Sequence, residues 1–369
     1  MLDTVLIAMF LALGVLLVFH ALMFSLLAFG QVRGTPDRKL PISIVICARN
    51  EAHHLQELIP LLMDQDHEEL EVVVVNDRSQ DDTAEVLEWM RPKFPRLRAV
   101  NIQADEKFNY GKKIALGVGV REARYDRVLV TDADCRPVGR DWVSLMASGF
   151  AKGRTIVLGH SPYRRSHGIT DLLERYDGLS KAVLYVSAAK AGLPYMGVGR
   201  NLAYTKETFF QARGKGPRKH DQLMSGDDDL FINQVAKGRS TAVMVDPASF
   251  METDGTPGLS MWFRRKRRHY TTARYYRFGH KIMLMVFPLA RSVFWASLAT
   301  LGLLGAWWEF ILGLSVKLVL FLPVMLRAMY RLGADRSILL AALPLEWLFL
   351  VLDPIIYFST MVMKPRRWK

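Results

Sequence analysis

Two aspartates separated by a single residue end one short apolar run of the chain. The run, VLVTDADC at residues 128–135, places the carboxylates of Asp132 and Asp134 directly after a series of aliphatic residues. Such a run is typical of a strand buried on both faces of a parallel sheet, and these sheets bind ligands beyond the carboxyl ends of their strands. Mg²⁺ and Mn²⁺ prefer oxygen ligands of this type. The pair therefore predicts a metal site, although the motif alone leaves open a helix N-cap or a solvated loop.

Polar residues follow two other apolar runs in the same way. ISIVICA leads into Arg49, Asn50 and Glu51, and EVVVVND ends in Asp77. Because the carboxyl ends of parallel strands meet at one edge of a sheet, we expect these side chains to lie near the aspartate pair. No G-x-G-x-x-G sequence follows the first run, so a phosphate group would be bound by side chains and helix N-termini.

A pair of lysines, Lys112 and Lys113, opens a helical pattern after the third strand pattern. A lysine at this place can hold a diphosphate as a point charge. An exposed lysine at the start of a helix is the alternative reading, and it involves no ligand.

Three adjacent carboxylates, Asp227, Asp228 and Asp229, stand at the start of another helical pattern in the sequence SGDDDLF. Their mutual repulsion raises the pKa of at least one of them, which suits a general base. Negative charge also stabilises a helix N-terminus, so a well-capped helix is the alternative.

Strand and helix patterns alternate through the middle of the chain and would position these groups. The strand patterns cover residues 42–48, 71–77, 97–102 and 127–134, and helical patterns cover residues 51–63 and 80–90 and begin again at residue 111. This order predicts an α/β domain, Rossmann-like, with a mostly parallel sheet and helices on both faces.

Apolar segments stand at both ends of the chain. Residues 5–29 contain His20 as their single ionisable residue, and residues 282–363 consist of long apolar stretches interrupted by single ionisable residues. A run of about 20 apolar residues spans a bilayer as a helix. The first segment follows Asp3 with no Lys or Arg ahead of it and is longer than the apolar part of a signal peptide, so we predict a transmembrane anchor.

Basic residues indicate which side of the membrane the middle domain occupies. Arg33, Arg38 and Lys39 directly follow the anchor, and the positive-inside rule then predicts a cytoplasmic domain in a multi-pass protein of the inner or cytoplasmic membrane. The net charge of +13 could suggest nucleic-acid binding. The basic run at residues 262–281 precedes the apolar block, however, so anionic headgroups or a phosphate of a lipid or nucleotide explain it better, and no nucleic acid is expected.

The C-terminal region is predicted to hold about three transmembrane helices, near residues 292–308, 310–326 and 338–363. Three spans would place the basic tail KPRRWK outside, against the positive-inside rule. Either the last segment re-enters, or residues 282–290 lie in the membrane interface. The predicted division of the chain is an anchor at 1–31, a catalytic domain at 40–257, a basic interfacial segment at 258–281 and a transmembrane region at 282–369.

Taken in order, the motifs resemble those of membrane-integrated family 2 glycosyltransferases with the GT-A fold. The resemblance covers residues 41–270 and is carried by PISIVICARNEA, VVNDRSQDDT, YGKKIAL, TDAD, GVGRNLAY and SGDDDLF. Each motif is weak by itself, whereas all of them in this order are specific.

The resemblance implies a role for each matching residue. It implies nucleotide-sugar binding by Ala48, Arg49, Asn50, Glu51, Asp77, Lys112 and Asp132, a Mg²⁺ or Mn²⁺ ion held by Asp134 with Asp132, acceptor binding by Gly199, Arg200, Asn201 and His269, and catalysis by Asp228, Asp227, Arg265 and Arg268. Asp228 occupies the place of the catalytic base, and a UDP-sugar is the favoured donor.

One motif departs from the pattern of the family. Membrane-integrated members carry Gln or Arg, two spacers and then Arg-Trp, whereas this chain has Arg265 and Arg268 followed by His269. Histidine offers a smaller apolar face to an acceptor sugar than tryptophan does, which argues against a processive synthase.

The leading expectation is a membrane-bound inverting glycosyltransferase that passes a sugar from a nucleotide-sugar to a lipid or lipid-linked hydroxyl. The layout resembles that of ceramide glucosyltransferases and bacterial lipid glycosyltransferases. The alternatives are a processive synthase of a β-linked polysaccharide, such as poly-N-acetylglucosamine or a cellulose-like glycan, and a non-catalytic membrane scaffold that retains the fold. The complete acidic set argues against the scaffold.

Overall fold

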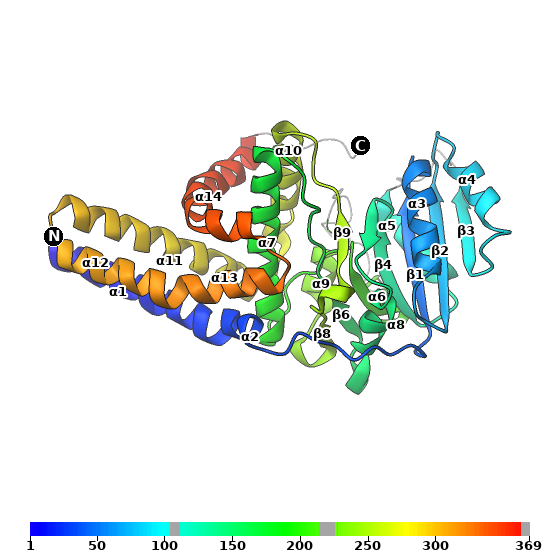
Figure 1. The fold of residues 1–369 in the computed structure, drawn as a ribbon, viewed down its shortest axis with the longest axis horizontal. Helices are drawn as coiled ribbons and strands as arrows, with labels where there is room; N and C mark the ends of the chain where they lie inside the picture. The colour runs from blue at the N-terminus through cyan, green and yellow to red at the C-terminus, as the bar shows by residue number, and fades with distance from the viewer. Residues whose placement is uncertain (104–110, 214–225, 227, 363–369) are drawn as a thin grey trace.

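An α/β domain and a bundle of long apolar helices make up the chain (Figure 1). The structure is a computed structural model and describes residues 1–103, 111–213, 226 and 228–362. In Figure 1 the helical bundle extends to one side of the α/β domain, with the N-terminus at its far tip.

The α/β domain is built on a seven-stranded sheet of order β3-β2-β1-β4-β7-β6-β8. Its strands are β1 Ile42–Ala48, β2 Leu70–Asp77, β3 Leu97–Ile102, β4 Arg127–Asp132, β6 Ile156–Leu158, β7 Leu202–Thr205 and β8 Thr241–Val243. The first four strands pair in parallel, β7 runs antiparallel to β4 and β6, and β8 is parallel to β6. A two-stranded sheet of β5 (Cys135–Pro137) and β9 (Met251–Thr253) lies beside it. The predicted mostly parallel sheet is confirmed.

Helices cover both faces of the large sheet because consecutive strand residues point to opposite sides. In β2, Val72 and Val74 pack on one face, and Val73 and Val75 on the other. The first face is covered by α3 (Ala52–Met63), α4 (Thr83–Met90) and α6 (Trp142–Ser148), and the second by α5 (Lys112–Glu122), α8 (Lys206–Arg213) and α9 (Asp229–Val235). Short 3₁₀ turns cover Ala151–Gly153, Gly238–Ser240, Pro247–Ser249 and Ala273–Tyr275.

The close approach of α5 to the sheet depends on Gly119. A Cβ atom at this position would lie 2.4 Å from Cγ1 of Val45, which is closer than carbon atoms can approach. The glycine therefore sets the depth at which α5 packs, and with it the position of Lys112 at the start of the helix.

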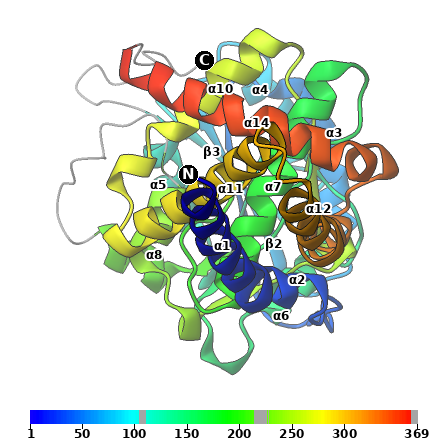
Figure 2. The ribbon, with the colours of Figure 1, turned by 90° about the vertical axis from the view of Figure 1, so that its left-hand side faces the viewer.

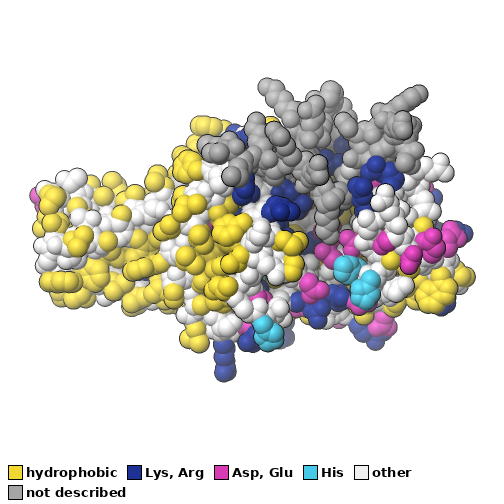
Figure 3. Space-filling model, turned by 90° about the horizontal axis from the view of Figure 1, so that it is seen from above, with side chains coloured by type: hydrophobic (Ala, Val, Ile, Leu, Met, Phe, Trp, Pro, Cys, Tyr) yellow, Lys and Arg dark blue, Asp and Glu magenta, His cyan; other side chains and the backbone are white. Residues whose placement is uncertain are grey.

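Four helical segments among the described residues are long and apolar enough to cross a membrane: Leu2–Ala28, Phe278–Leu303, Trp307–Arg331 and Arg336–Thr360. They comprise α1 Leu2–Phe19, a π-helical turn at His20–Phe24 and α2 Ser25–Ala28; α11 Phe278–Leu303; α12 Trp307–Val316, a π-helical turn at Lys317–Phe321 and α13 Leu322–Arg331; and α14 Arg336–Val362. The first three segments lie alongside one another in Figure 1, and Figure 2 shows them nearly end on with α14 running across them. Hydrophobic side chains dominate the surface of this region, whereas charged side chains gather over the α/β domain (Figure 3).

The second apolar helix begins earlier than the sequence suggested. We expected a span at residues 292–308, but α11 starts at Phe278. Lys281 and Arg291 interrupt the apolar pattern, yet backbone hydrogen bonding continues through them because neither residue opposes a helix.

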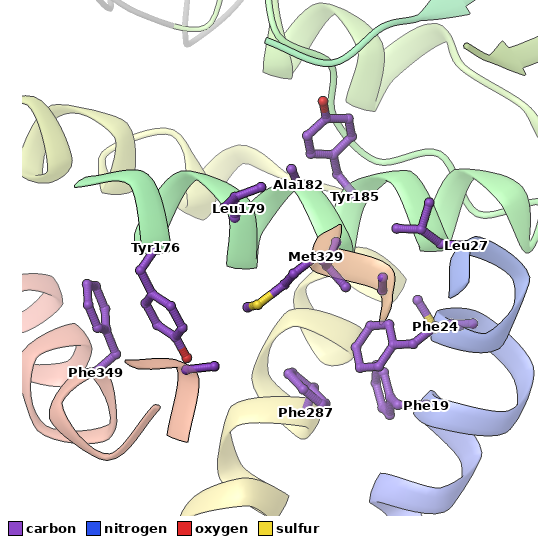
Figure 4. Close-up of a cluster of buried hydrophobic side chains, with 14 of the residues drawn as sticks. Phe19, Phe24, Leu27, Tyr176, Leu179, Ala182, Tyr185, Phe287, Met329 and Phe349 are labelled. Atoms are coloured by element: carbon purple, nitrogen blue, oxygen red, sulfur yellow. The ribbon is translucent and has the colours of Figure 1, made fainter. Parts of the chain in front are cut away.

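Two helices, α7 (Ile169–Lys190) and α10 (Leu259–Tyr270), join the two parts. Figure 4 shows that Tyr176 and Tyr185 leave α7 in opposite directions. The ring of Tyr176 packs on Phe349 of α14 at 5.2 Å, while the hydroxyl of Tyr185 donates to Gly159 O of the α/β domain at 2.9 Å. The same core contains the aromatic group of Phe19, Phe24 and Phe287 from the bundle (Figure 4).

Candidate active site

The strand register brings the predicted polar residues to one edge of the sheet. Ala48 of β1 pairs with Asn76 of β2, and Cys47 of β1 pairs with Asp132 of β4. Asp77 follows Asn76 directly, so the carboxyl ends of three adjacent strands carry these groups side by side. The arrangement that the sequence predicted for this edge is therefore present.

Asp132 forms an ion pair with the first residue of α5. Nζ of Lys112 lies 2.7 Å from Oδ1 of Asp132. Burial acts most strongly on this carboxyl and favours its neutral form, but the positive charges of Lys112, Arg200 and Arg268 outweigh burial and hold the pKa of Asp132 below its ordinary value. Asp132 is thus kept ionised by cations from three separate elements.

Arg200 lies close to the aspartate pair. Its guanidinium stands 4.8 Å from the ring centre of Tyr163. Burial lowers its pKa, but Tyr163 and the acidic groups, including Asp132 and Asp134, raise it above the ordinary value overall. The resemblance implied acceptor binding for Arg200, and its place beside the aspartates also suits a negatively charged leaving group.

Asp134 stands just beyond β4, next to a buried thiol. Sγ of Cys135 lies 3.6 Å from Oδ1 of Asp134. Burial, with the charges of Asp132 and Asp134, raises the pKa of the Cys135 thiol, so the sulfur stays protonated and does not compete as a metal ligand.

Asp77 is buried and keeps one carboxylate oxygen available. Its Oδ1 accepts from Nε of Arg78 at 2.9 Å, whereas Oδ2 has no hydrogen-bond partner among the residues that the structure describes. A buried acceptor without a donor is costly, so it predicts a donor from a bound molecule, as the N–H of a nucleotide base would supply.

The loops that follow β1 and β2 are tied to each other. The amide of Asn50 donates to Oγ of Ser79 at 2.9 Å, and Oδ1 of Asn50 accepts from the amide of Gln80 at 2.8 Å. Asn50 has a φ of 56°, a left-handed conformation that asparagine adopts more readily than most residues. These bonds fix the rim where Arg49 and Glu51 also stand.

Asp228 caps helix α9 and reaches the loop after α7. Oδ1 of Asp228 accepts from the amide of Asp229 at 2.7 Å, and Oδ2 accepts from the amide of Gly199 at 2.8 Å. The helix cap that the sequence left open is therefore present, and the same carboxylate contacts Gly199 of the GVGRNLAY loop. Asp227 lies outside the described residues.

Asp229 has a structural role. Its Oδ2 accepts from Oγ1 of Thr272 at 2.5 Å and from the hydroxyl of Tyr276 at 2.8 Å. Asp229 thereby fixes the start of α9 to the segment between α10 and α11.

Asn201 is a correction to the predicted acceptor site. Its amide nitrogen donates to His160 O and Ser249 O, each at 2.8 Å, and its oxygen accepts from Nε1 of Trp142 at 3.0 Å. The side chain is completely buried. Asn201 therefore shapes the loop from inside, and its side chain is not available to contact an acceptor.

The basic motif lies on α10, and its two arginines differ. Nη1 of Arg265 lies 2.9 Å from Oε1 of Glu174 on α7. Arg268 is close enough to Asp132 to lower the pKa of that carboxyl, and within the described part of the chain the buried Nε of Arg268 has no hydrogen-bond partner. Burial and the positive charges of Arg268 and Lys181 lower the pKa of His269 to about 3, so this imidazole is neutral near pH 7.

Residues 43–185 match the sequence profile of Glycosyl transferase family 2. This segment is a family 2 glycosyltransferase domain. A mannosyltransferase from Pyrobaculum calidifontis, solved with GDP-Man and Mn²⁺, superposes with a TM-score of 0.58 at 19% identity over 96% of this chain and 99% of that one. The likeness shows that the two share the GT-A fold, and the predicted fold class is confirmed.

Sequence relatives match over shorter lengths. A poly-β-1,6-N-acetyl-D-glucosamine synthase of Staphylococcus epidermidis is 30% identical over 93 residues, which are 25% of this chain and 21% of the relative. An uncharacterized glycosyltransferase of Haemophilus influenzae is 26% identical over 113 residues, 30% of this chain and 33% of the relative. The chain thus matches about a fifth to a third of the length of these curated relatives.

The glycosyltransferase domain offers a partial set of metal ligands. Among the described residues, no group of three or more His, Cys, Asp and Glu side chains is arranged to hold a metal ion. Asp132 and Asp134 supply two hard oxygen donors, which fit Mg²⁺ or Mn²⁺ if donor phosphates and water complete the shell. The residues therefore fit a cation that arrives with, or is completed by, a diphosphate.

Sequence reasoning missed three residues of this glycosyltransferase site: Tyr163, Glu174 and Lys181. Tyr163 contacts both Arg200 and Arg265, Glu174 pairs with Arg265, and Lys181 lowers the pKa of His269. No motif contains them, and their partners lie far along the chain. The sequence holds one weak indication that two of them act together: Glu174 and Lys181 are seven residues apart and so share one face of a helix.

Proposed function

We propose that this protein is a membrane-bound inverting glycosyltransferase that transfers one sugar from a nucleotide-sugar to a hydroxyl of a lipid or lipid-linked acceptor. The observation that carries the proposal is the gathering of Asp132, Arg200 and Arg268 from three elements at the carboxyl edge of the sheet. Alternating acidic and basic groups of this kind suit a diphosphate leaving group with a divalent cation.

The donor would be held along the sheet edge. Asp77 would accept a hydrogen bond from the base through its free Oδ2, and Asp132 with Asp134 would hold Mg²⁺ or Mn²⁺ against the diphosphate. When bound, the ion would neutralise charge that develops on the leaving group. Lys112 and Arg268 would add positive charge on either side of the diphosphate.

Asp228 would act as the base in a single displacement. The proton of the acceptor hydroxyl passes to the carboxylate, the hydroxyl oxygen bonds to the anomeric carbon, and the bond from that carbon to the diphosphate breaks, so the nucleoside diphosphate leaves with the electron pair. One displacement inverts the anomeric centre. Hydrogen bonds from Gly199 and Asp229 amides would orient the carboxylate for this step.

A lipid acceptor is supported by the position of the site. Arg268 and His269 lie on α10, and only a short segment separates that helix from α11, which is long and apolar enough to span a membrane. An acceptor that enters from the bilayer would therefore reach the site over a short path. We further propose that the catalytic domain faces the cytoplasm, as the basic residues after the anchor suggest.

A processive synthase of poly-N-acetylglucosamine is the second candidate, because part of the domain is 30% identical to a synthase of that polymer. The size of the product distinguishes the two candidate functions. Membranes with the protein would be incubated with single nucleotide-sugars, including UDP-N-acetylglucosamine, UDP-glucose and GDP-mannose, and the products analysed by mass spectrometry. A lipid carrying one added sugar supports the first proposal, a polymer supports the second, and no product above an Asp134→Ala control with any donor contradicts both.

A further inference from the structure

The helix α14 is unusual among the four apolar helices because it runs across the other three (Figures 1 and 2). By length and composition it could span a membrane. Its contacts at both ends allow its actual placement to be inferred.

The chain enters α14 on the side of the catalytic domain. The loop that follows α13 is fixed there, because Leu332 O lies 3.1 Å from Nε2 of His160 in the α/β domain. Asp335, next to the first residue of α14, accepts from Nη1 of Arg175 on α7 at 3.0 Å. Ser337 is bonded to the same arginine.

The chain is still on that side 18 residues later. Oδ1 of Asp353 lies 2.6 Å from Nζ of Lys266 and accepts from the hydroxyl of Tyr270 at 2.9 Å, and both partners belong to α10. A helix rises about 1.5 Å per residue, so Asp335 and Asp353 lie about 27 Å apart along the axis. A spanning helix could not keep both of these residues on the same side of the hydrocarbon core, which is about 30 Å thick.

One side of α14 is apolar and exposed. Leu340, Trp347, Val351 and Phe358 recur at intervals of seven, four and seven residues, lie within about 40° of one another around the axis, and are 56–84% exposed. We call these four the outer stripe. Glu346 and Asp353, also seven residues apart, lie about 120–140° from the centre of this stripe around the axis, and Glu346 pairs with Lys317 of the bundle at 2.8 Å.

We propose that α14 lies in the plane of the membrane, in the leaflet that faces the catalytic domain, with its outer stripe against lipid. Both carboxylates of α14, Glu346 and Asp353, are paired with protein, so the helix can lay its exposed apolar stripe against lipid without carrying an unpaired charge into it. The three spanning segments then leave the end of α14 on the side of the catalytic domain. This arrangement removes the conflict with the positive-inside rule that three C-terminal spans would create.

Membrane depth along the stripe tests the proposal. Single cysteines would replace Leu340, Val351 and Phe358 in the full chain, with Cys47 and Cys135 changed to alanine, and each would carry a nitroxide spin label in vesicles of phosphatidylcholine and phosphatidylglycerol. Depth follows from the relative accessibility of the label to oxygen and to a water-soluble nickel complex. The matched control is α1, where Ile7, Leu11, Val18 and Leu22 form an exposed stripe 15 residues long.

The proposal predicts equal depths, within a few Å, for the three labels on α14, whereas the labels along α1 should become deeper toward the bilayer centre and shallower again beyond it. Depths on α14 that differ by about 10 Å or more, with residue 351 far deeper than the label at one or both ends, would show that α14 spans the membrane and would overturn the proposal. Labels on α14 that are shielded from oxygen and show spin coupling between molecules would assign the stripe to a second copy of the chain, and would equally overturn the assignment to lipid.

Discussion

Arg265 donates a hydrogen bond to Glu174 across 2.9 Å, and this contact joins α10 to α7 at the side of the active site. Oε2 of Glu174 accepts from the amide and the hydroxyl of Thr256 as well. Arg265 is therefore already satisfied by protein, whereas Arg268, three residues later, keeps a buried Nε without a partner near Asp132. The two arginines of one motif thus differ, because Arg265 pairs with α7 and Arg268 lies near Asp132.

This division predicts different consequences for the two arginines. Arg268→Ala should lower turnover by more than about tenfold, because a fixed cation beside the diphosphate stabilises charge that grows in the transition state. Arg265→Ala should reduce activity less and lower the thermal midpoint more. Turnover at saturating donor, together with thermal unfolding of both variants in detergent, checks this. A reversed order would assign the catalytic cation to Arg265.

Asp134→Ala should abolish transfer and weaken donor binding in the presence of Mg²⁺ or Mn²⁺, because one of two available metal carboxylates is lost. The protein should still insert and fold. Donor binding would be measured by calorimetry with and without the divalent ion, and Asp82→Ala, an exposed change at the start of α4, is the control. Full activity of Asp134→Ala, or of the unchanged protein in excess chelator, would contradict the metal assignment.

The ion pair of Lys112 and Asp132 should leave a signature in the pH dependence of stability. The pKa of Asp132 lies below its ordinary value of 3.8, so its ionisation stabilises the fold above pH 4 and this contribution is lost as the pH falls further. Lys112→Met should therefore cost about 1.5–3 kcal/mol between pH 5 and 8. The difference from the unchanged protein should shrink below pH 4, as measured by thermal unfolding, whereas a difference that persists unchanged at pH 3 would mean that packing, not charge, is responsible.

Asp229 should matter for stability through its contact with Tyr276. Tyr276→Phe removes one donor from a buried carboxylate and should cost about 1–3 kcal/mol, seen as a lower thermal midpoint with donor affinity unchanged. Tyr330→Phe is the matched control, because Tyr330 is 67% exposed. Equal midpoints for the two variants would show that the Asp229 contact contributes nothing.

The sequence predicted the positions that depend on local pattern. The four predicted parallel strands are in place because their aliphatic runs favour buried strands, and the parallel register then aligns Ala48, Asp77 and Asp132 without further information. The bounds of β1, residues 42–48, match the prediction completely.

Features that depend on partners far away along the chain could not be predicted from the sequence. The burial of Asn201 depends on His160, Ser249 and Trp142, which lie up to 59 residues away. The pairing of Arg265 depends on Glu174, 91 residues earlier. The hydropathy of α14 shows that the helix is apolar but does not show how the helix is oriented. Its orientation follows from its ion pairs with α7 and α10.

The measurement that tests the central claim most directly is the turnover of Asp228→Asn at saturating donor. The amide keeps the shape of the side chain and an oxygen that can accept a backbone hydrogen bond, so donor binding and the thermal midpoint should stay close to those of the unchanged protein. Turnover should fall by about two to four orders of magnitude, the usual contribution of a positioned general base, while Asp229→Asn should retain far more activity per folded molecule. Near-normal turnover of Asp228→Asn, with Asp229→Asn inactive though folded, would contradict the account by placing the base on a different residue.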